Sequence, residues 1–468
     1  MKRKTARLII NPRSGKNVAR LTDIIAVLSA AGWKPDTALK EFGGHAIRLA
    51  RAAAEAGYDL VIGYGGDGTL NQIVNGVMRA KRRRTIVGVI PGGTANVWAH
   101  EIGIPEDPVK ASLLLVNSEG RKVDLGHVEV ERQGRERKSR PASRGRHHFL
   151  LMAGLGLDAA VLDRVSTPLK ERLGAVAVAL VAAKELPSQH AFPVEIRASD
   201  AGRAGGVLWK GEAVQVIVGN TRRYGNIAEV TPEAHIDDGM LDVCVITAGD
   251  PLTTIEQVLS TLLHREPVHG RSEYFQSAHF RISVPATVGL QLDGSRVKLK
   301  DYLAAPDRAA LRRAENPASV LLTYRFDALP RALCLAIPRT YDNALFEAGS
   351  ADDQPRVAEQ QHQDAAAVQS PEQIDALLEH GRKVTVVGVG PNPERKATYI
   401  VAGTSSDVNS GEAKPVAVRI DRETTLVRPT GEPLSVAFAA ELPEGGVIVV
   451  EGKPSKRGVI RAKRVVVG

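Results

Sequence analysis

The sequence predicts an α/β fold with three parts: a doubly wound N-terminal domain, a mainly antiparallel β domain and a small C-terminal β-barrel. Three strand–turn–helix units occur in the first 120 residues, and their turns are rich in glycine, serine and asparagine. From about residue 121 to 338 the apolar runs become short and frequent, which is typical of antiparallel strands. After residue 380, strand-like runs alternate with glycine and proline turns, a pattern similar to that of OB-type barrels.

Length and composition indicate where these parts begin and end. At 468 residues the chain exceeds one ordinary domain. We expect an α/β domain at 1–120, a β-rich domain at 121–338, a linker at 339–369 and the small barrel at 370–468. The linker segment is polar and rich in Gln and Asp, and a capping signal at Ser370 begins a short helix behind it. Because the composition changes there, a chain ending near Pro338 is expected to fold alone.

Charge and hydropathy narrow the choice of partners. The net charge of +9 favours an acidic partner, such as a nucleotide, an anionic lipid surface or nucleic acid. Aromatic residues form only 4% of the chain, which argues against nucleic acid, whose bases stack on aromatic side chains. The longest apolar stretch, Leu173 to Ala183, is shorter than the ~20 residues that cross a bilayer. We therefore expect a cytoplasmic protein that touches the inner face of the membrane peripherally.

The run Gly65-Gly66-Asp67-Gly68-Thr69 is the central motif of the N-terminal domain. A buried strand precedes it at 60–64, and apolar residues at helical spacing follow it. Glycine lets the backbone approach a ligand closely, and a helix N-terminus favours anions. Asp67 would repel a phosphate, so it implies either a bound cation or a role in proton transfer. A plain surface turn is the alternative interpretation.

The other turns of this domain have a similar character. A strand at 6–10 ends in the turn 11–16, and a strand at 85–90 ends in the turn 91–96. The first turn lacks the spacing of a P-loop. In a doubly wound domain, ligands bind outside the carboxyl ends of the strands, where these turns meet. The remaining elements expected here are a strand near 36–41 and a helix over 45–56.

Several longer runs recur in a recognisable order. They are IINPRSGK, GGDGTLNQIVNG and PGGTANVWAHEIGIP, followed by VDLG, GLGLDA, TPEAHIDDGMLDV and QLDG. Together they resemble the catalytic domain of the diacylglycerol kinase superfamily, especially the bacterial soluble lipid kinases, over roughly residues 1–338. NAD kinases share the GGDGT element, but the sequence motif that follows Pro91 resembles that of lipid kinases. The resemblance implies transfer of the γ-phosphoryl group of ATP, with Mg²⁺, to a lipid hydroxyl at the membrane surface.

The resemblance also implies roles for individual residues. Asp67 is expected near the phosphates and Mg²⁺, and Asp124 of VDLG in the same magnesium-centred network. Asp238 matches a side chain that binds a structural magnesium, with the carbonyls of His235 and Met240 completing the shell. Simple turn formation is the alternative for Asp124 and Asp238. The residues that match the nucleotide-binding motifs are Asn11, Ser14, Gly66, Thr69, Gly92, Thr94 and Asn96.

One position departs from the family pattern. The family usually has Asp-Gly-Glu where this chain has Asp293-Gly294-Ser295. The missing Glu is the residue most often given the role of general base, and a serine without an adjacent base cannot replace it at neutral pH. Two hypotheses follow: a lipid kinase with Asp293 and Ser295 at the acceptor side, or a non-catalytic nucleotide- or lipid-binding regulator. The acceptor (diacylglycerol, sphingoid base or polyprenol) and homodimer formation stay open.

Three further segments bear on the membrane and the barrel. An apolar helix expected at 168–186 is either a core helix or part of an acyl-chain cleft. The basic segments 132–148 and 81–84 are either solvated loops or contacts with anionic lipid, at ~1 kcal/mol per basic residue. The last hairpin of the barrel is basic, and we expect an electrostatic or interaction role there rather than recognition of single strands.

Overall fold

The computed structural model describes residues 4–13, 20–81, 84–131, 147–156, 191–200, 203–224, 228–247, 272–299, 302–303, 305–347, 371–392, 397–406 and 413–468. Ser14, the helix expected at 168–186 and nearly all of the basic segment 132–148 lie outside the described residues. Within the described ranges, the helices are too short or too polar to serve as membrane spans.

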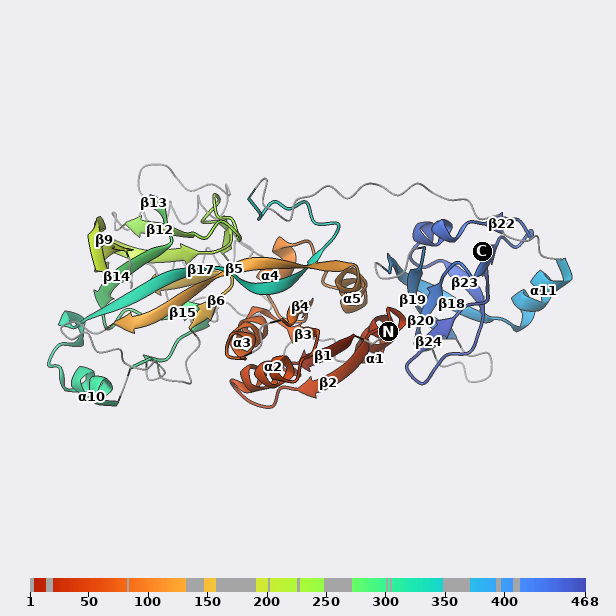
Figure 1. Ribbon diagram of the computed structural model, residues 1–468, viewed down its shortest axis with the longest axis horizontal. Coiled ribbons are helices and arrows are strands. Elements are labelled where there is room, and N and C mark those ends of the chain that lie inside the picture. Colours follow the sequence, from red (N-terminus) through yellow and green to blue (C-terminus); the bar gives the residue numbers. More distant parts are fainter. Residues whose placement is uncertain are drawn as a thin grey trace.

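The N-terminal domain is doubly wound, as predicted. Its parallel strands lie in the order β4-β3-β1-β2. Helices α2 and α3 cover one face of this sheet, and α1 and α5 cover the other (Figure 1). Burial on both faces explains why the central strand, LVIGYG, is buried along its whole length. The elements are β1 (Thr5–Ile10), α1 (Leu21–Ala30), β2 (Lys34–Leu39), α2 (His45–Glu55), β3 (Leu60–Gly65), α3 (Asp67–Met78), β4 (Ile86–Pro91), α4 (Val97–Glu101) and α5 (Pro108–Val116).

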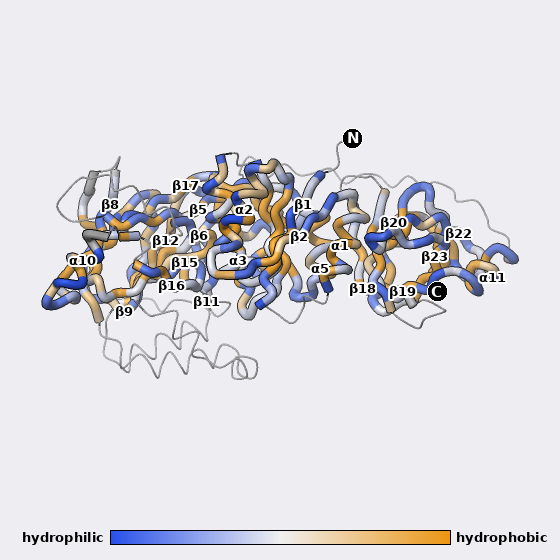
Figure 2. The backbone as a smooth tube through the Cα atoms, turned by 90° about the horizontal axis from the view of Figure 1, so that it is seen from below, coloured by the Kyte–Doolittle hydropathy of each residue, from blue (hydrophilic) through white to orange (hydrophobic). Residues whose placement is uncertain are grey.

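Two long strands join this domain to the β-rich part. β5 (Ser118–Glu131) and β17 (Leu321–Pro338) pair antiparallel along almost their full lengths. β17 also pairs in parallel with β4, so one sheet continues from the doubly wound domain into the second domain. Figure 2 shows hydrophobic residues concentrated in the middle of the molecule, where the parallel strands lie.

The second domain is mainly antiparallel, as predicted, with the path β16-β15-β7-β9-β8-β14-β17 through its sheet. Its own apolar core includes Phe326, whose ring contacts the rings of Phe149 and Phe280. The elements are β6 (His148–Phe149), β7 (Met152–Gly156), β8 (Phe192–Asp200), β9 (Arg203–Gly219), β10 (Arg223–Tyr224), β11 (Ala228–Glu229), β12 (Leu241–Thr247), β13 (Ser272–Ser277), β14 (His279–Pro285), β15 (Leu290–Leu292), β16 (Ser295–Arg296), α10 (Ala305–Arg313) and η4 (Pro317–Ser319).

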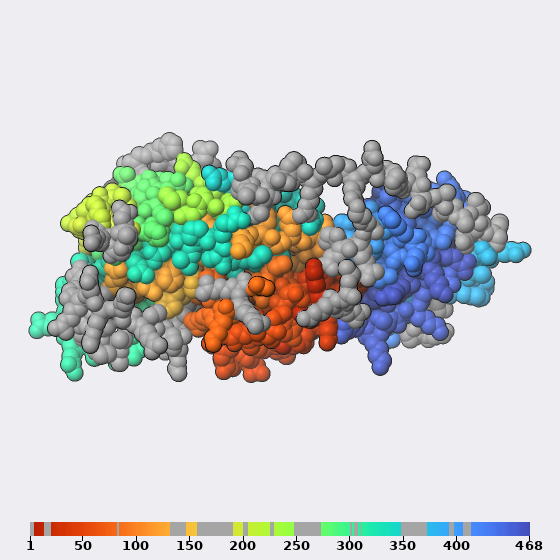
Figure 3. Space-filling view, viewed as in Figure 1, coloured from red at the N-terminus to blue at the C-terminus, as the bar shows by residue number. Residues whose placement is uncertain are grey.

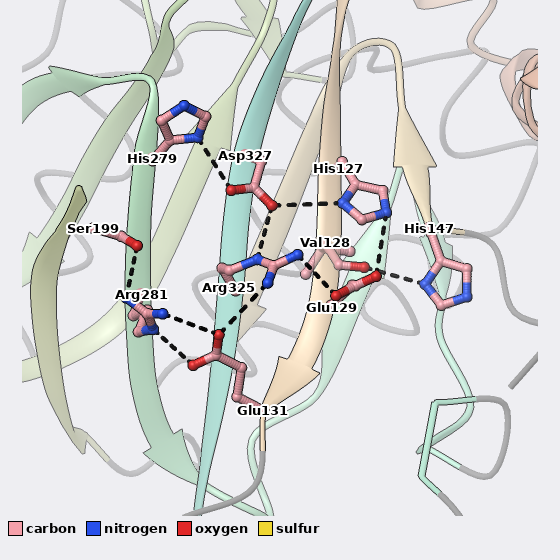
Figure 4. A network of polar contacts seen from close by, with 10 residues as sticks. All are labelled: His127, Val128, Glu129, Glu131, His147, Ser199, His279, Arg281, Arg325 and Asp327. Atoms are coloured by element: carbon pink, nitrogen blue, oxygen red, sulfur yellow. Dashed lines mark hydrogen bonds and ion pairs between the residues drawn. The ribbon is translucent and has the colours of Figure 1, made fainter. Parts of the chain in front are cut away.

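The opposite face of this sheet carries a network of charged side chains (Figure 4). Arg325 of β17 is at its centre and forms ion pairs of 2.9 Å with both Glu129 and Asp327. Arg281 of β14 pairs with Glu131 at 2.7 Å. These strands alternate in period 2, so the charged residues and the phenylalanines of the core occupy opposite faces.

Asp327 in this network is expected to stabilise the protein above pH ~4 and to lose that contribution toward pH 2. Burial would raise the pKa of its carboxyl, but His127, Arg325 and His279 lower it to about 2. An unfolded Asp has a pKa of ~3.9, so the unfolded state binds more protons in this window and stability falls as pH falls. The difference between the two pKa values corresponds to at most ~2.6 kcal/mol. Urea unfolding of Asp327→Asn should therefore show a weaker pH dependence than the wild type between pH 4 and 2. Equal slopes would contradict this assignment.

The C-terminal part is the small barrel expected from the sequence. β18 pairs with β19 and β23, β19 with β20, β20 with β24, and β23 with β25. β24 pairs with β20, and β25, which follows almost directly, pairs with β23. These two short strands together therefore close the ring of strands, as in an OB-type barrel. The elements are α11 (Pro371–His380), β18 (Arg382–Pro391), β19 (Tyr399–Ser406), β20 (Ala413–Ile420), β21 (Thr425–Val427), β22 (Pro433–Leu434), η5 (Val436–Glu441), β23 (Val447–Glu451), β24 (Val459–Arg461) and β25 (Arg464–Val467).

Two sets of contacts attach the segment after β17 and the barrel to the rest of the protein, where we expected a linker and a separate domain. Residues 339–347, which we expected to be linker, pack against the body: Leu345 and Phe346 are buried, and the Ile236 N–H donates to the Leu345 carbonyl at 2.8 Å. The barrel itself sits beside the N-terminal domain (Figure 3) and packs against α1 and α5.

Candidate active site

The two glycine turns at the carboxyl ends of β3 and β4 touch each other, backbone against backbone. A Cβ atom added at Gly93 would lie 2.5 Å from the Cα of Gly66, and one at Gly66 would lie 3.0 Å from the Cα of Gly93. No side chain fits at either position without moving a turn, which explains the glycines there. The Gly92 N–H also donates to the Gly65 carbonyl at 3.2 Å.

Asp67 ties the central turn to the start of α4. It is the first residue of α3 and half-buried. Its two carboxylate oxygens accept hydrogen bonds from the Val97 N–H at 3.0 Å and the Trp98 N–H at 3.1 Å. Burial raises the pKa of Asp67, and these two hydrogen bonds oppose the rise. The carboxylate therefore holds two turns together, and its raised pKa makes it a better proton acceptor at neutral pH.

The third turn is shaped by its own asparagine. Asn96 is buried and has a positive φ of 48°. Its side chain accepts from the Gly93 N–H at 2.9 Å and donates to the Gly93 carbonyl at 3.0 Å. Thr94, at the tip of the same turn, is exposed. Among the predicted nucleotide contacts in this turn, Thr94 is thus open to a ligand, while the Asn96 side chain supports the turn from inside.

The first turn joins the same edge. The Asn11 N–H donates to the Tyr64 carbonyl at 3.0 Å, and the Asn11 amide donates to the Thr69 hydroxyl at 3.4 Å. The structure therefore gathers the described members of the predicted nucleotide set at one sheet edge. They are Asn11, Gly66, Thr69, Gly92, Thr94 and Asn96.

Asp293 lies in the hairpin between β15 and β16 and is buried, with a positive φ of 45°. Its carboxylate accepts four hydrogen bonds, from the Asn71 amide at 2.8 Å and from the backbone N–H groups of residues 150–152 at 2.8–3.1 Å. Burial raises its pKa, and these donors oppose the rise. We expected Asp293 at the acceptor hydroxyl. Its surroundings instead make it a positioning residue that fixes the hairpin on α3.

Ser295 is the residue of this hairpin that faces the central turn. Its hydroxyl oxygen lies 3.3 Å from the place where a Cβ on Gly68 would be. Gly68 directly follows Asp67, so the hairpin brings position 295 to the turn that carries the central acid. A longer acidic side chain at this position would reach the space in front of the turn.

Asp124 belongs to a different cluster from Asp67. It is fully buried and accepts from the Gly239 N–H and the Arg331 N–H, both at 2.6 Å. Burial and, to a smaller extent, the nearby charges of Asp238 and Asp237 raise its pKa to about 6, and the two hydrogen bonds oppose the rise. The charged neighbour with the largest effect on Asp67 is His100. The described contacts thus place Asp124 with the loop at 235–240, and they do not support one network shared with Asp67.

The loop at 235–240 supplies some of the oxygen ligands that a hard cation such as Mg²⁺ needs. The Asp238 carboxylate accepts from the Met240 N–H at 2.8 Å, and burial raises its pKa. The His235 ring faces the Arg222 guanidinium at 3.3 Å. In the described part of the chain, no three His, Cys, Asp or Glu side chains are arranged to hold a metal ion. A magnesium ion here would therefore rely on backbone carbonyls beside Asp238, and it would relieve the repulsion between the neighbouring acids.

Three further residues support the site and were missed in the sequence. Asn71 and Asn75 of α3 hold the second domain: Asn71 donates to Asp293, and Asn75 donates to the His148 carbonyl at 2.8 Å. Asparagine is a poor residue for a helix interior, and two of them in NQIVNG were the available signal. Glu101 of α4 accepts from the Arg222 N–H at 3.0 Å, and burial raises its pKa to about 7.

Comparison with known proteins agrees with this geometry. Residues 5–128 match the family model of the diacylglycerol kinase catalytic domain, and residues 152–297 match the YegS C-terminal NAD kinase β sandwich-like domain. Neither model reaches the barrel. A crystal structure of a diacylglycerol kinase from Bacillus anthracis has a TM-score of 0.51 and 21% identity, covering 74% of this chain and 99% of that one, which supports the fold.

Two curated relatives extend the comparison. A protein of Chromohalobacter salexigens named probable lipid kinase YegS-like is 28% identical over 319 residues, 68% of this chain and 95% of that protein. A diacylglycerol kinase of Bacillus subtilis is 30% identical over 295 residues, which are 62% of this chain and 89% of that protein. With the matched domains, these relatives show that the chain is a lipid kinase of the bacterial diacylglycerol kinase family.

Proposed function

We propose that this protein transfers the γ-phosphoryl group of ATP to the hydroxyl of a lipid at the membrane surface. The observation that carries the proposal is the meeting of three features: the paired glycine turns, the Asp67 carboxylate between them, and Ser295 against Gly68. Phosphoryl transfer depends mainly on positioning and on neutralising charge, and a set of fixed turns suits both needs.

The turns would bind the phosphates of ATP. The N-terminus of α3 lies at this edge, where backbone N–H groups and the helix dipole favour anions, whereas the first N–H groups of α4 already donate to Asp67. A bound Mg²⁺ would neutralise charge on the transferred phosphoryl group. Asp67 would hold it through the lone pairs that Val97 and Trp98 leave unused, and Asp238 would hold a separate structural ion.

Asp67 would also receive the proton of the acceptor hydroxyl. The usual glutamate is replaced by Ser295, and Asp67 directly precedes Gly68, the residue that Ser295 faces. The hydroxyl oxygen attacks the γ-phosphorus, the bond from that phosphorus to the β–γ bridging oxygen breaks, and the proton passes to the Asp67 carboxylate. In a loose transition state the proton leaves late, so a base that is not ideally placed still supports turnover.

Diacylglycerol is the acceptor we propose to examine first. Relatives with this name include those of Bacillus subtilis and Staphylococcus epidermidis. The net charge of +9 suits an anionic membrane surface, so we propose peripheral action at the cytoplasmic face. The second candidate function is a nucleotide-binding regulator without catalysis, and the absence of the glutamate at position 295 is the observation that favours it.

An acceptor panel tests the proposal. The full-length protein would be given ATP and Mg²⁺ with diacylglycerol, a sphingoid base or a polyprenol in mixed micelles, and kcat/KM would be measured for each. We expect diacylglycerol to give the highest value. A higher value for another lipid would reassign the acceptor, and ATP binding without phosphorylation of any lipid would favour the regulator.

A further inference from the structure

Helix α5 is packed on two sides. Leu115 points to the parallel sheet, where a Cβ at Gly88 would lie 2.6 Å from its Cδ1. Leu113 points the other way and packs on the barrel: a Cβ would lie 3.1 Å from Leu113 Cδ1 at Gly388 and 3.4 Å from Leu113 Cβ at Gly390. A helix that buries apolar residues on opposite sides belongs to the interior of a larger unit. The barrel therefore forms a further layer of the N-terminal domain (Figure 1).

Helix α1 has the same arrangement. A Cβ at Gly458, in the loop before β24, would lie 3.4 Å from the Cβ of Ala26 in α1. The barrel residues Ile400, Ala402 and Ala417 are buried in the same hydrophobic cluster as the parallel sheet. At the rim, the Lys110 ammonium group of α5 donates to the Glu444 carboxylate of the barrel at 2.6 Å.

The barrel docks through the face that OB-type barrels use for nucleic acid. That face is formed by the second and third strands, which correspond to β19 and β20 here. Both strands contact α1, and β19 also contacts α5. The surface available for base recognition in other barrels is thus covered by this chain itself.

Both covered helices begin beside the nucleotide turns. Asp107 caps α5 and accepts from the Val109 and Lys110 N–H groups, both at 2.9 Å, and Arg20 directly precedes α1. Both charges act on the Tyr64 hydroxyl, whose pKa burial raises to about 12. The Tyr64 ring in turn lies 3.2 Å from the place of a Cβ on Gly92. Helices α1 and α5 contact each other, and both begin on the side of the sheet edge where ATP is proposed to bind.

We infer that the barrel is a structural part of the ATP site, an inference that rests on the proposed function. By holding α1 against α5, it fixes the start of α1 at Leu21 relative to the third turn at 91–96. Leu113 and the glycines of β18 are positioning residues in this arrangement. The inference opposes our sequence-based expectation that a chain ending near Pro338 folds alone, because such a chain would expose the apolar outer sides of both helices.

The test loosens the interface in the full-length protein and measures ATP binding. Leu113→Asp places a charge between α5 and the barrel while Leu115 still anchors α5 on the sheet. Isothermal titration with ATP and Mg²⁺ should show a Kd raised about tenfold, whereas KM for the lipid should change little. Hydrogen exchange should show faster exchange of the α1 and α5 amides. Ala376→Asp is the matched control, because it adds the same charge to an exposed position on α11, away from α1 and α5.

A milder pair of variants guards against simple misfolding. Lys110→Glu sets two negative charges against each other at the exposed rim, and adding Glu444→Lys restores an opposite pair. We expect a rise of about twofold in the Kd for ATP in the single variant and recovery in the double variant. The Leu113→Asp protein could be folded and show faster exchange of the α1 and α5 amides, and still bind ATP with an unchanged Kd. That result would overturn this inference and leave the proposed function standing. Failure of the wild type to bind ATP would overturn the proposed function as well.

Discussion

Asp67→Asn is expected to lower kcat/KM for lipid phosphorylation by about 10²–10⁴-fold, the usual contribution of a general base. The variant loses the proton acceptor and one ligand charge for Mg²⁺. It also places an amide NH₂ group against one of the two backbone N–H donors at Val97 and Trp98. The two glycine turns remain packed through their backbones, so the thermal unfolding temperature should change by only a few degrees.

Steady-state kinetics and thermal unfolding measure these two effects separately. Asp36→Asn is a suitable control, because Asp36 is an exposed acid on β2 that bonds to Tyr58 rather than to the turns. Wild-type activity in Asp67→Asn would show that the centre has been assigned to the wrong residue.

Ser295→Glu is expected to raise kcat by about tenfold or more, because it restores a base at the acceptor side. Ser295 is only half-buried and its neighbour is Gly68, which has no side chain, so the hairpin has room for a longer residue. KM for ATP should stay unchanged, since the substitution does not touch the turns that hold the phosphates. Kinetics at saturating ATP and varied lipid would measure the gain.

Ser295→Gln is the matched control for this variant, because it has the size of glutamate without its basicity. A gain in the glutamate variant that the glutamine variant lacks would assign the effect to proton transfer. If Ser295→Glu slows a brisk wild type, the base lies elsewhere and Ser295 helps to shape the acceptor site.

The sequence was most informative where one local pattern determines one local structure. The glycine-rich turns predicted a close approach of the backbone to a ligand, and the structure adds a reason for two of these glycines, because Gly66 and Gly93 pack against each other. The alternation of apolar strands and helices predicted the doubly wound domain, and the run of short strands after residue 380 predicted the barrel.

Side-chain roles that depend on distant partners were not predictable in this way. The donors to Asp293 come from residues 71 and 150–152, far away in the chain, so its motif did not reveal that its carboxylate is fully used. Asp124 likewise meets Gly239 and Arg331 only after the strands have paired. The docking of the barrel depends on Leu113 of α5. This helix is rich in leucine, and that pattern is equally typical of an ordinary core helix, so it did not predict the docking.

The most direct test of the account is the transfer of label from γ-labelled ATP into lipid. Purified full-length protein would be incubated with labelled ATP, Mg²⁺ and a total lipid extract, and the label in the organic phase would be counted beside an Asp67→Asn sample. We expect a labelled phospholipid in the wild-type sample that is nearly absent from the variant. An organic phase without label from a wild-type protein that binds ATP would contradict it.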